Sequence, residues 1–541
     1  MVPVPENGLH GDHREVRAPA LAGRKPWRGY EPVNPRGRGM HVREATMKRF
    51  MIIMMLSLAV FLHCTDYISG IKDELDLARR VWFQDAYLKA SNVDAGDKFG
   101  VIVAVSGDTM VVGTPWESSN QTGITNIDGS AATDNGALES GAAYVYKKDG
   151  SGNWIQDAYI KASNAGASDW FGVSVAVSGD TIVVGASGED GSGAAYVFKK
   201  NSSGDWIEDD LLKASNAESG DNFGHSVAVS GDTIVVGAYG EDSGQITIDN
   251  SDNQPTSVNN LASDSGAAYV YKKDGSGNWI QDAYLKASNA ELSDHFGYSV
   301  AISGDTIVVG ATGEAGSGAA YVFKKNSSGD WIEDDLLKAS NAEASDNFGI
   351  SVAVSGDTIV VGAYAEDSDR TFITNDDELA STDNSAGDSG AAYVFKRDGS
   401  GNWIQDACLK ASNARASDGF GDSVAVSGDI IVVGAHSEKS GQTTITNTDG
   451  LASTVFTSPD YGAAYVFKKD GSGNWFQDAY LKASNAGGGD FFGYVAVSGD
   501  TIVVGAIGED SGQTTIMNTD GSANADDSAV ESGAAYVFTL K

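Results

Sequence analysis

The sequence predicts an all-β protein, a seven-bladed β-propeller built of four-stranded antiparallel blades. Three observations lead to this prediction. One sequence unit recurs seven times, each unit holds four short runs of β-forming residues, and the two ends of the repeated region carry complementary parts of one unit. A fixed repeat of this length builds one body from several copies, so 541 residues need not mean several domains. The units begin at a Phe-Gly pair whose phenylalanines are Phe99, Phe171, Phe223, Phe296, Phe348, Phe420 and Phe492.

Each unit contains the same four segments in the same order. With small variations they read SVAVSGD, TIVVGA, GAAYVFKK and WIQDAYLKA. The first three are rich in Val, Ile, Tyr and Phe and are bounded by Gly, Asp and Ser, which is typical of short strands. The turn before the fourth segment, DGSGN or NSSGD, predicts a hairpin. Four antiparallel strands per unit and seven units predict the propeller.

The ends of the repeated region predict how the ring closes. A fourth-type segment, residues 82–90, stands alone before the first unit, and the last unit stops at Lys541 after its third segment. We expect segment 82–90 to pair with the last blade, because this pairing completes the blade and removes two exposed sheet edges. An open solenoid would instead need polar end caps, and the sequence has none.

The N-terminal residues have a different composition from the repeats. Residues 1–46 are basic and read either as a disordered segment or as an extension upstream of the true start at Met47. Residues 47–64 read as a signal peptide, because Met47-Lys48-Arg49 precedes an apolar run, 50–62, that is too short to span a membrane. Residues 65–81 form a linker, and 82–541 form the propeller. We therefore expect a secreted or cell-surface protein, with Cys64 as a possible lipid anchor.

The net charge of the chain limits the classes of partner that it is expected to bind. The formal net charge is −37, and the ten basic and five acidic residues of 1–64 leave −42 on the remainder. A body this acidic repels nucleic acid and anionic lipid, so we expect neither as a partner. The sequence shows no Ser-His-Asp order, no metal-binding His pair and no nucleotide-binding loop. We therefore expect a protein that is not an enzyme.

The repeats resemble a known family. The pattern FGxSVAVSGDTIVVGAxxED…GAAYVF over residues 82–541 is similar to the FG-GAP repeat, found in the propeller of integrin α-subunits and in many bacterial surface proteins. The resemblance implies a propeller that binds ligands outside the cell. Repeats of this family often carry a calcium loop, DxDxDGxxD, between the first two strands. Here that connection is only SGDT, for example residues 106–109, which cannot supply six to eight oxygen ligands.

Two features of the aligned units are candidate sites. The first is a glutamate three residues beyond the Gly-Ala pair (Gly-Thr-Pro in the first unit). It reads either as a ligand-binding crown of carboxylates that attracts cations or as a solvated or backbone-bonding residue kept by duplication. The seven candidates are Glu117, Glu189, Glu241, Glu314, Glu366, Glu438 and Glu509.

The second feature is a long insertion between the second and third strands of units one, three, five, six and seven. Each insertion contains Asn-x-Asp, which reads either as half of a calcium loop or as an ordinary Asx turn. Calcium is therefore a possible cofactor. The candidate metal ligands are Asn126 and Asp128, Asn250 and Asp252, Asn375 and Asp377, Asn447 and Asp449, and Asn518 and Asp520.

These observations together predict an exported or cell-surface binding or adhesion module. Long loops without strands of their own are usually functional or disordered, and all five should lie on one face. We expect that face to contact a protein or glycan ligand. Two alternatives stay open, a secreted carbohydrate-active or other hydrolytic enzyme that uses carboxylates in the central funnel, and a structural envelope protein.

Overall fold

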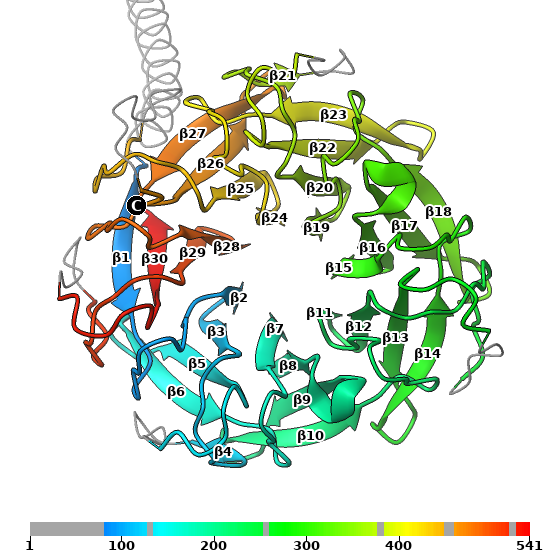
Figure 1. The fold of residues 1–541 in the computed structure, drawn as a ribbon, viewed down its shortest axis with the longest axis horizontal. Coiled ribbons are helices and arrows are strands. Elements are labelled where there is room, and N and C mark those ends of the chain that lie inside the picture. Colours follow the sequence, from blue (N-terminus) through cyan, green and yellow to red (C-terminus); the bar gives the residue numbers. More distant parts are fainter. Residues whose placement is uncertain (1–79, 127–133, 253–258, 376–382, 448–458, 519–525) are drawn as a thin grey trace, which may run out of the picture. The chain divides into compact units, whose positions relative to one another are not determined.

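The computed structural model describes residues 80–126, 134–252, 259–375, 383–447, 459–518 and 526–541. The N-terminal extension, the expected signal peptide and Cys64 lie outside the described residues. From residue 80 onward the strands form seven four-stranded antiparallel sheets arranged in a ring (Figure 1). The all-β fold and the seven blades are confirmed. We number the blades 1 to 7 in the order of their inner strands.

Equivalent strands occupy equivalent places in every blade. The inner strands are β2 (Ile102–Ser106), β7 (Phe171–Ser178), β11 (Ser226–Ser230), β15 (Phe296–Ser303), β19 (Val352–Ser355), β24 (Val424–Ser427) and β28 (Phe492–Ser498). The second strands are β3 (Thr109–Thr114), β8 (Thr181–Ala186), β12 (Thr233–Ala238), β16 (Thr306–Ala311), β20 (Thr358–Ala363), β25 (Ile430–Ala435) and β29 (Thr501–Ala506). The third strands are β5 (Ala142–Lys148), β9 (Ala194–Lys200), β13 (Ala267–Lys273), β17 (Ala319–Lys325), β22 (Ala391–Arg397), β26 (Ala463–Lys469) and β30 (Ala534–Leu540).

The outer strands all begin at a tryptophan. They are β6 (Trp154–Ile160), β10 (Trp206–Leu212), β14 (Trp279–Leu285), β18 (Trp331–Leu337), β23 (Trp403–Leu409), β27 (Trp475–Leu481) and β1 (Trp82–Leu88). Two short strands, β4 (Ile124–Thr125) and β21 (Thr374–Asn375), add a fifth member to blades 1 and 5. The short loops of blades 2 and 4 each contain a 3-10 turn, Glu189–Gly191 and Glu314–Gly316.

The Phe-Gly and Gly-Ala pairs pack one blade against the next. Phe99 is fully buried, and its ring meets Tyr144 edge-on with centroids 5.3 Å apart. Gly100 has φ +96°, and a Cβ on it would lie 2.3 Å from the carbonyl oxygen of Ala534. A Cβ on Gly113 would lie 2.2 Å from the carbonyl oxygen of Gly172 in the next blade. Only glycine permits these close approaches, which explains why the pairs recur.

The hydrophobic core is divided among the spaces between blades. One of these cores joins Val111 and Val145 of blade 1 to Phe171, Ile182 and Trp206 of blade 2, and six similar clusters complete the ring in the part of the chain that the structure describes. Side chains alternate between the two faces of a strand, so each TIVVGA segment contributes to two neighbouring cores. This explains why the segment is apolar throughout.

The ring closes as the ends of the repeats predict. Strand β1 pairs antiparallel with β30 in a register that places Trp82 opposite Leu540 and Leu88 opposite Ala535. Blade 7 therefore takes its outer strand from the beginning of the ring and its other three strands from the end (Figure 1).

Candidate functional site

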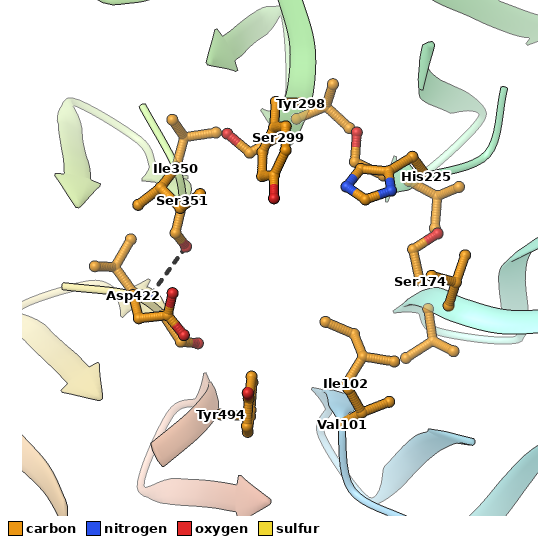
Figure 2. Close-up of a pocket in the computed structure, with 18 of the residues that line it drawn as sticks. Val101, Ile102, Ser174, His225, Tyr298, Ser299, Ile350, Ser351, Asp422 and Tyr494 are labelled. Atoms are coloured by element: carbon orange, nitrogen blue, oxygen red, sulfur yellow. Dashed lines mark hydrogen bonds between the residues drawn. The ribbon is translucent and has the colours of Figure 1, made fainter. Parts of the chain in front are cut away.

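The inner strands surround a cavity of about 420 Å³ on the axis of the ring. The residue that follows each Phe-Gly pair lies where an inner strand begins, and its side chain borders this cavity (Figure 2). In chain order these residues are Val101, Val173, His225, Tyr298, Ile350, Asp422 and Tyr494, and we call them the axial ring.

The axial ring is where the repeated units differ most plainly. The residues on both sides of it are nearly constant, with Phe-Gly before and Ser-Val-Ala after in most units. Duplication would have copied this position with its neighbours, yet it holds valine, histidine, tyrosine, isoleucine and aspartate. The position after the Gly-Ala pair varies as well, with Tyr239 in blade 3 and His436 in blade 6. The sequence therefore carries a signal at the channel, which the motifs and invariant carboxylates of the repeats do not include.

The serines beside the axial ring hold the blades in place. The hydroxyl of Ser174 donates to the carbonyl oxygen of Gly224 at 2.7 Å, and Ser226 and Ser299 bond the next blade in the same way at 2.9 and 2.8 Å. These hydroxyls therefore form hydrogen bonds between neighbouring blades. The axial residues beside them present their side chains to the cavity.

An aromatic cluster lies where blades 3 and 4 meet. The ring of His225 lies 4.6 Å from that of Tyr239 and 4.9 Å from that of Tyr298, measured between centroids. Tyr239 also meets His295 edge-on at 5.9 Å. Burial lowers the pKa of His225 to about 4, so this imidazole is neutral at neutral pH. A neutral imidazole has one donor and one acceptor nitrogen.

A second cluster, which contains a carboxylate, lies where blades 6 and 7 meet. Nδ1 of His436 lies 3.1 Å from Oδ2 of Asp422, and the imidazole stacks on Tyr494 with an interplanar angle of 23°. Burial acts to lower the pKa of His436, but the adjacent carboxylate of Asp422, together with the charge of Asp460, outweighs it and raises that pKa above its usual value. Burial and the charge of Asp422 also raise the pKa of Tyr298. Figure 2 shows Asp422 and Tyr494 on one side of the cavity and His225 and Tyr298 on the other.

The seven candidate glutamates do not form an exposed crown. Each is buried, with 0 to 6% of its surface exposed, and each pairs with a lysine that follows the outer strand on the chain. The pairs are Glu117–Lys161, Glu189–Lys213, Glu241–Lys286, Glu314–Lys338, Glu366–Lys410, Glu438–Lys482 and Glu509–Lys89. In the six pairs other than Glu189–Lys213, the nitrogen–oxygen distance is 2.7 to 3.0 Å.

Further polar groups satisfy these buried carboxylates. The amide of Asn92 donates to Glu117 at 3.0 Å, and Ser119 donates its backbone N–H to the same oxygen at 3.1 Å. Charge pairs at this depth are retained when hydrogen bonds complete them. The geometry therefore places the seven glutamates within the blade framework, one per blade, and their role in ligand binding stays a prediction.

The asparagines of the long loops clamp neighbouring blades together. Oδ1 of Asn126, in the loop of blade 1, accepts the backbone N–H of Trp206 at 2.6 Å, and its Nδ2 donates to the carbonyl of the same tryptophan at 2.8 Å. The other four asparagines do the same. These clamps are Asn250 on Trp331, Asn375 on Trp475, Asn447 on Trp82 and Asn518 on Trp154.

Blades 2 and 4 have short loops, so the tryptophans that follow them have no such clamp. Trp279 and Trp403 are 7% and 6% exposed, whereas the five clamped tryptophans are at most 2% exposed. The short loops also uncover Lys213 and Lys338, whose side chains are about a third exposed, while the equivalent lysines elsewhere are buried. The part of each long loop next to its asparagine therefore has a structural role, because it shields the tryptophan of the next blade and the lysine of its own blade from solvent.

The calcium hypothesis gains no support from the described part of the loops. Both polar atoms of each candidate asparagine are occupied by tryptophan backbone, and Asp252 pairs with Lys272 at 3.2 Å. Across the described residues no group of three or more His, Cys, Asp or Glu side chains could hold a metal ion. The other four candidates, Asp128, Asp377, Asp449 and Asp520, lie outside the described residues, so calcium binding there stays a prediction.

Comparison with known proteins identifies the family. The model of the FG-GAP repeat matches seven segments that together cover most of the chain. They are residues 82–146, 154–198, 206–271, 279–323, 331–395, 403–467 and 475–523.

The chain belongs to the FG-GAP repeat family. Each matched segment begins at the tryptophan of an outer strand, so the FG-GAP unit is offset by one strand from the blade. No curated protein matches the chain. A solved structure described as "a putative 6-phosphogluconolactonase from Bacteroides uniformis" is 11% identical, with a TM-score of 0.40, and the match covers 67% of this chain and 84% of that one. No helix among the described residues is long and apolar enough to cross a membrane.

Proposed function

We propose that this FG-GAP propeller is an exported or cell-surface binding module that acts without catalysing a reaction. In this proposal, a protein or glycan ligand contacts the face that bears the long loops, at the mouth of the central channel. The observation that carries the proposal is the axial ring. It differs between units whose other residues are nearly identical, and it places an aspartate, a histidine and two tyrosines around one cavity.

The topology brings the channel mouth and the long loops to the same face. In each blade the inner strand begins, the second strand ends and the third strand begins at one end of an antiparallel sheet. The axial residue and the insertion between the second and third strands therefore share that end. Backbone bridges join the two regions directly, as between Gly141 at the end of one insertion and Phe171 of the next Phe-Gly pair. A ligand at the channel would meet both.

A hydrolytic enzyme is the second candidate, and one observation favours it. Asp422 and His436 form a pair beside the cavity, which is an arrangement that can move a proton. Glycoside hydrolysis, however, generally uses two carboxyl groups about 5 to 9.5 Å apart. Asp422 is the one carboxylate among the described residues that line the cavity. This composition favours binding over hydrolysis.

A binding screen tests the proposal. The purified chain is assayed against a panel of glycans and extracellular proteins, next to an Asp422→Val variant that carries the residue of blades 1 and 2. The control is Ile207→Phe on the outer strand of blade 2, where blade 6 already has Phe476. We expect a ligand whose affinity falls at least tenfold in Asp422→Val and is unchanged in the control. A ligand that binds both variants equally would refute a site at the channel.

Two further measurements test whether the protein is an enzyme and whether it is exported. A panel of hydrolase substrates should show no turnover, and turnover that is lost in Asp422→Val would replace the binding module with an enzyme. Export is tested by cell fractionation of the chain with and without residues 47–64. We expect only the chain that contains them to leave the cytoplasm, and retention of both chains inside would contradict export.

A further inference from the structure

Building on the proposed function, we propose that the channel mouth binds the end of an uncharged saccharide. Asp422 and Tyr494 on one side and His225 and Tyr298 on the other would contact one terminal sugar unit, while His436 stays paired with Asp422. The inference rests on the size of the cavity, its aromatic faces and the charges of its polar groups.

The size and shape of the cavity suit a ligand that enters end-on. Its volume of about 420 Å³ is within the usual range for small-molecule sites. Seven inner strands enclose it on all sides (Figure 1). A closed ring admits the narrow end of a chain rather than a strand or helix laid across it. One or two sugar units have these dimensions.

The aromatic groups supply the surfaces that a sugar ring requires. A pyranose presents C–H groups on its faces and hydroxyls at its rim, and aromatic side chains likewise combine an apolar body with a polar tip. Tyr298 and Tyr494 border the cavity, and their phenol oxygens make no hydrogen bond with the described residues. Val101 and Val173 add apolar surface in blades 1 and 2, and Ile350 adds it between Tyr298 and Asp422 (Figure 2). The combination fits a ligand that is apolar on its faces and polar at its rim.

The charges at the site favour a neutral ligand. Asp422 is already paired with His436 at 3.1 Å, so the carboxylate has its own counter-charge whenever the imidazole is protonated and gains less from a cation. The strongly acidic body repels anionic sugars such as uronates and sulfated glycans. His225, neutral at neutral pH, can both donate and accept hydrogen bonds, as a sugar hydroxyl does. The three observations point to hydroxyls rather than to a charged group.

Direct titration of the full chain with defined probes tests the inference. The neutral probes are the methyl glycosides of glucose, galactose and mannose, with N-acetylglucosamine. The charged probes are glucuronate and tetramethylammonium. Saturation-transfer NMR detects binding and calorimetry gives affinity and stoichiometry. We expect at least one neutral probe to bind at one site per chain, with an affinity reduced at least tenfold in Asp422→Val and in Tyr494→Val.

The variants keep the inference falsifiable. Valine already stands at the axial position of blades 1 and 2, so both variants should fold, and an unchanged melting temperature verifies this. Ile207→Phe should bind the neutral probe as the parent does. If only a charged probe binds and loses affinity in the two variants, the saccharide inference fails while the proposed function stands. If no probe binds and no ligand of the panel responds to the variants, both fail.

Discussion

Nζ of Lys89 lies 2.8 Å from Oε2 of Glu509, which joins the first strand of the ring to the last blade across 420 residues of sequence. Lys89 also donates to the hydroxyl of Ser532 at 2.8 Å, and both members of the ion pair are buried. Each of the other six blades contains the equivalent pair. At blade 7 alone it links the two ends of the ring, so it fastens the closure as well as the blade.

Removing Lys89 should therefore weaken the closure strongly. Lys89→Met leaves a buried carboxylate without its partner, which typically costs about 3 to 5 kcal/mol. Denaturant unfolding measures this loss. The double change Lys89→Met and Glu509→Gln leaves no unpaired charge and should cost clearly less. Equal losses in the single and double variants would contradict the pairing.

The asparagine clamp predicts a local effect at a named amide. Asn518→Ala removes two hydrogen bonds to the backbone of Trp154, and an unsatisfied backbone group costs on the order of 1 to 3 kcal/mol. Hydrogen exchange should show faster exchange of the Trp154 amide, with Trp279 as an internal control because no asparagine clamps it. No change in Trp154 exchange would refute the clamp.

The uncovered edges of blades 2 and 4 predict an effect on association. On the outer strands of these blades an aspartate stands where the other units have alanine. Its carboxylate accepts a backbone N–H at the exposed edge of the strand. The backbone N–H of Leu211 donates to Oδ1 of Asp210 and that of Leu336 to Asp335, each at 2.9 Å. In blade 3 the equivalent N–H, that of Tyr284, donates to the loop at Asp249.

Exposed edge amides promote pairing with other chains. The double variant Asp210→Ala and Asp335→Ala should therefore self-associate at concentrations where the parent is monodisperse in sedimentation velocity. Ile207→Phe on the same strand controls for surface change and should sediment as the parent does. A double variant with the parent's sedimentation profile would show that the aspartates do not protect the edges.

Buried aspartates before the Phe-Gly pairs predict a pH dependence of stability. Burial raises the pKa of Asp97 to about 8 and those of Asp221, Asp418 and Asp490 to about 7. Their unfolded value is 3.8, so between roughly pH 4 and 8 the folded chain binds more protons than the unfolded chain. The free energy of unfolding should therefore fall as pH rises through this window.

Urea unfolding at pH 5.5 and pH 8 measures this effect, and the lower pH should give the higher midpoint. Asp221→Asn removes one titrating group while it keeps an acceptor for the N–H of Glu218, so it should reduce the difference. A midpoint that rises from pH 5.5 to pH 8 would contradict the assignment.

The repeated sequence predicts the fold, but it does not predict the contacts that join distant segments. Strand order, blade number and the pairing of segment 82–90 follow from local β-patterning and from the incomplete end units, so they are predictable. The glutamates illustrate the limit. Glu117 and its equivalents are charged and present in every unit, which resembles a surface site. Their lysine partners, however, lie 24 to 45 residues away in sequence in blades 1 to 6 and 420 residues away in blade 7, so the pairing depends on how a blade folds.

The candidate site illustrates the opposite limit. When the seven units are aligned, the axial ring appears as one variable position between nearly constant neighbours, and such a position does not by itself indicate a site. The site becomes recognisable only in the folded propeller, where the seven blades place these seven positions around one axis. The sequence predicts either half of a calcium loop or an Asx turn at Asn126 and its equivalents. Their amides instead bind tryptophan backbone of the next blade, and a loop that reaches a neighbouring blade cannot be recognised from spacing alone.

One measurement tests the central claim, a ligand at the axial ring, most directly. A variant with His225→Val, Tyr298→Val, Asp422→Val and Tyr494→Val makes the ring almost uniformly aliphatic with a residue that blades 1 and 2 already carry there. Its binding to the glycan and protein panel is compared with that of the parent at matched melting temperature. We predict a folded propeller that has lost the ligand. A folded propeller that binds the panel as the parent does would contradict the claim.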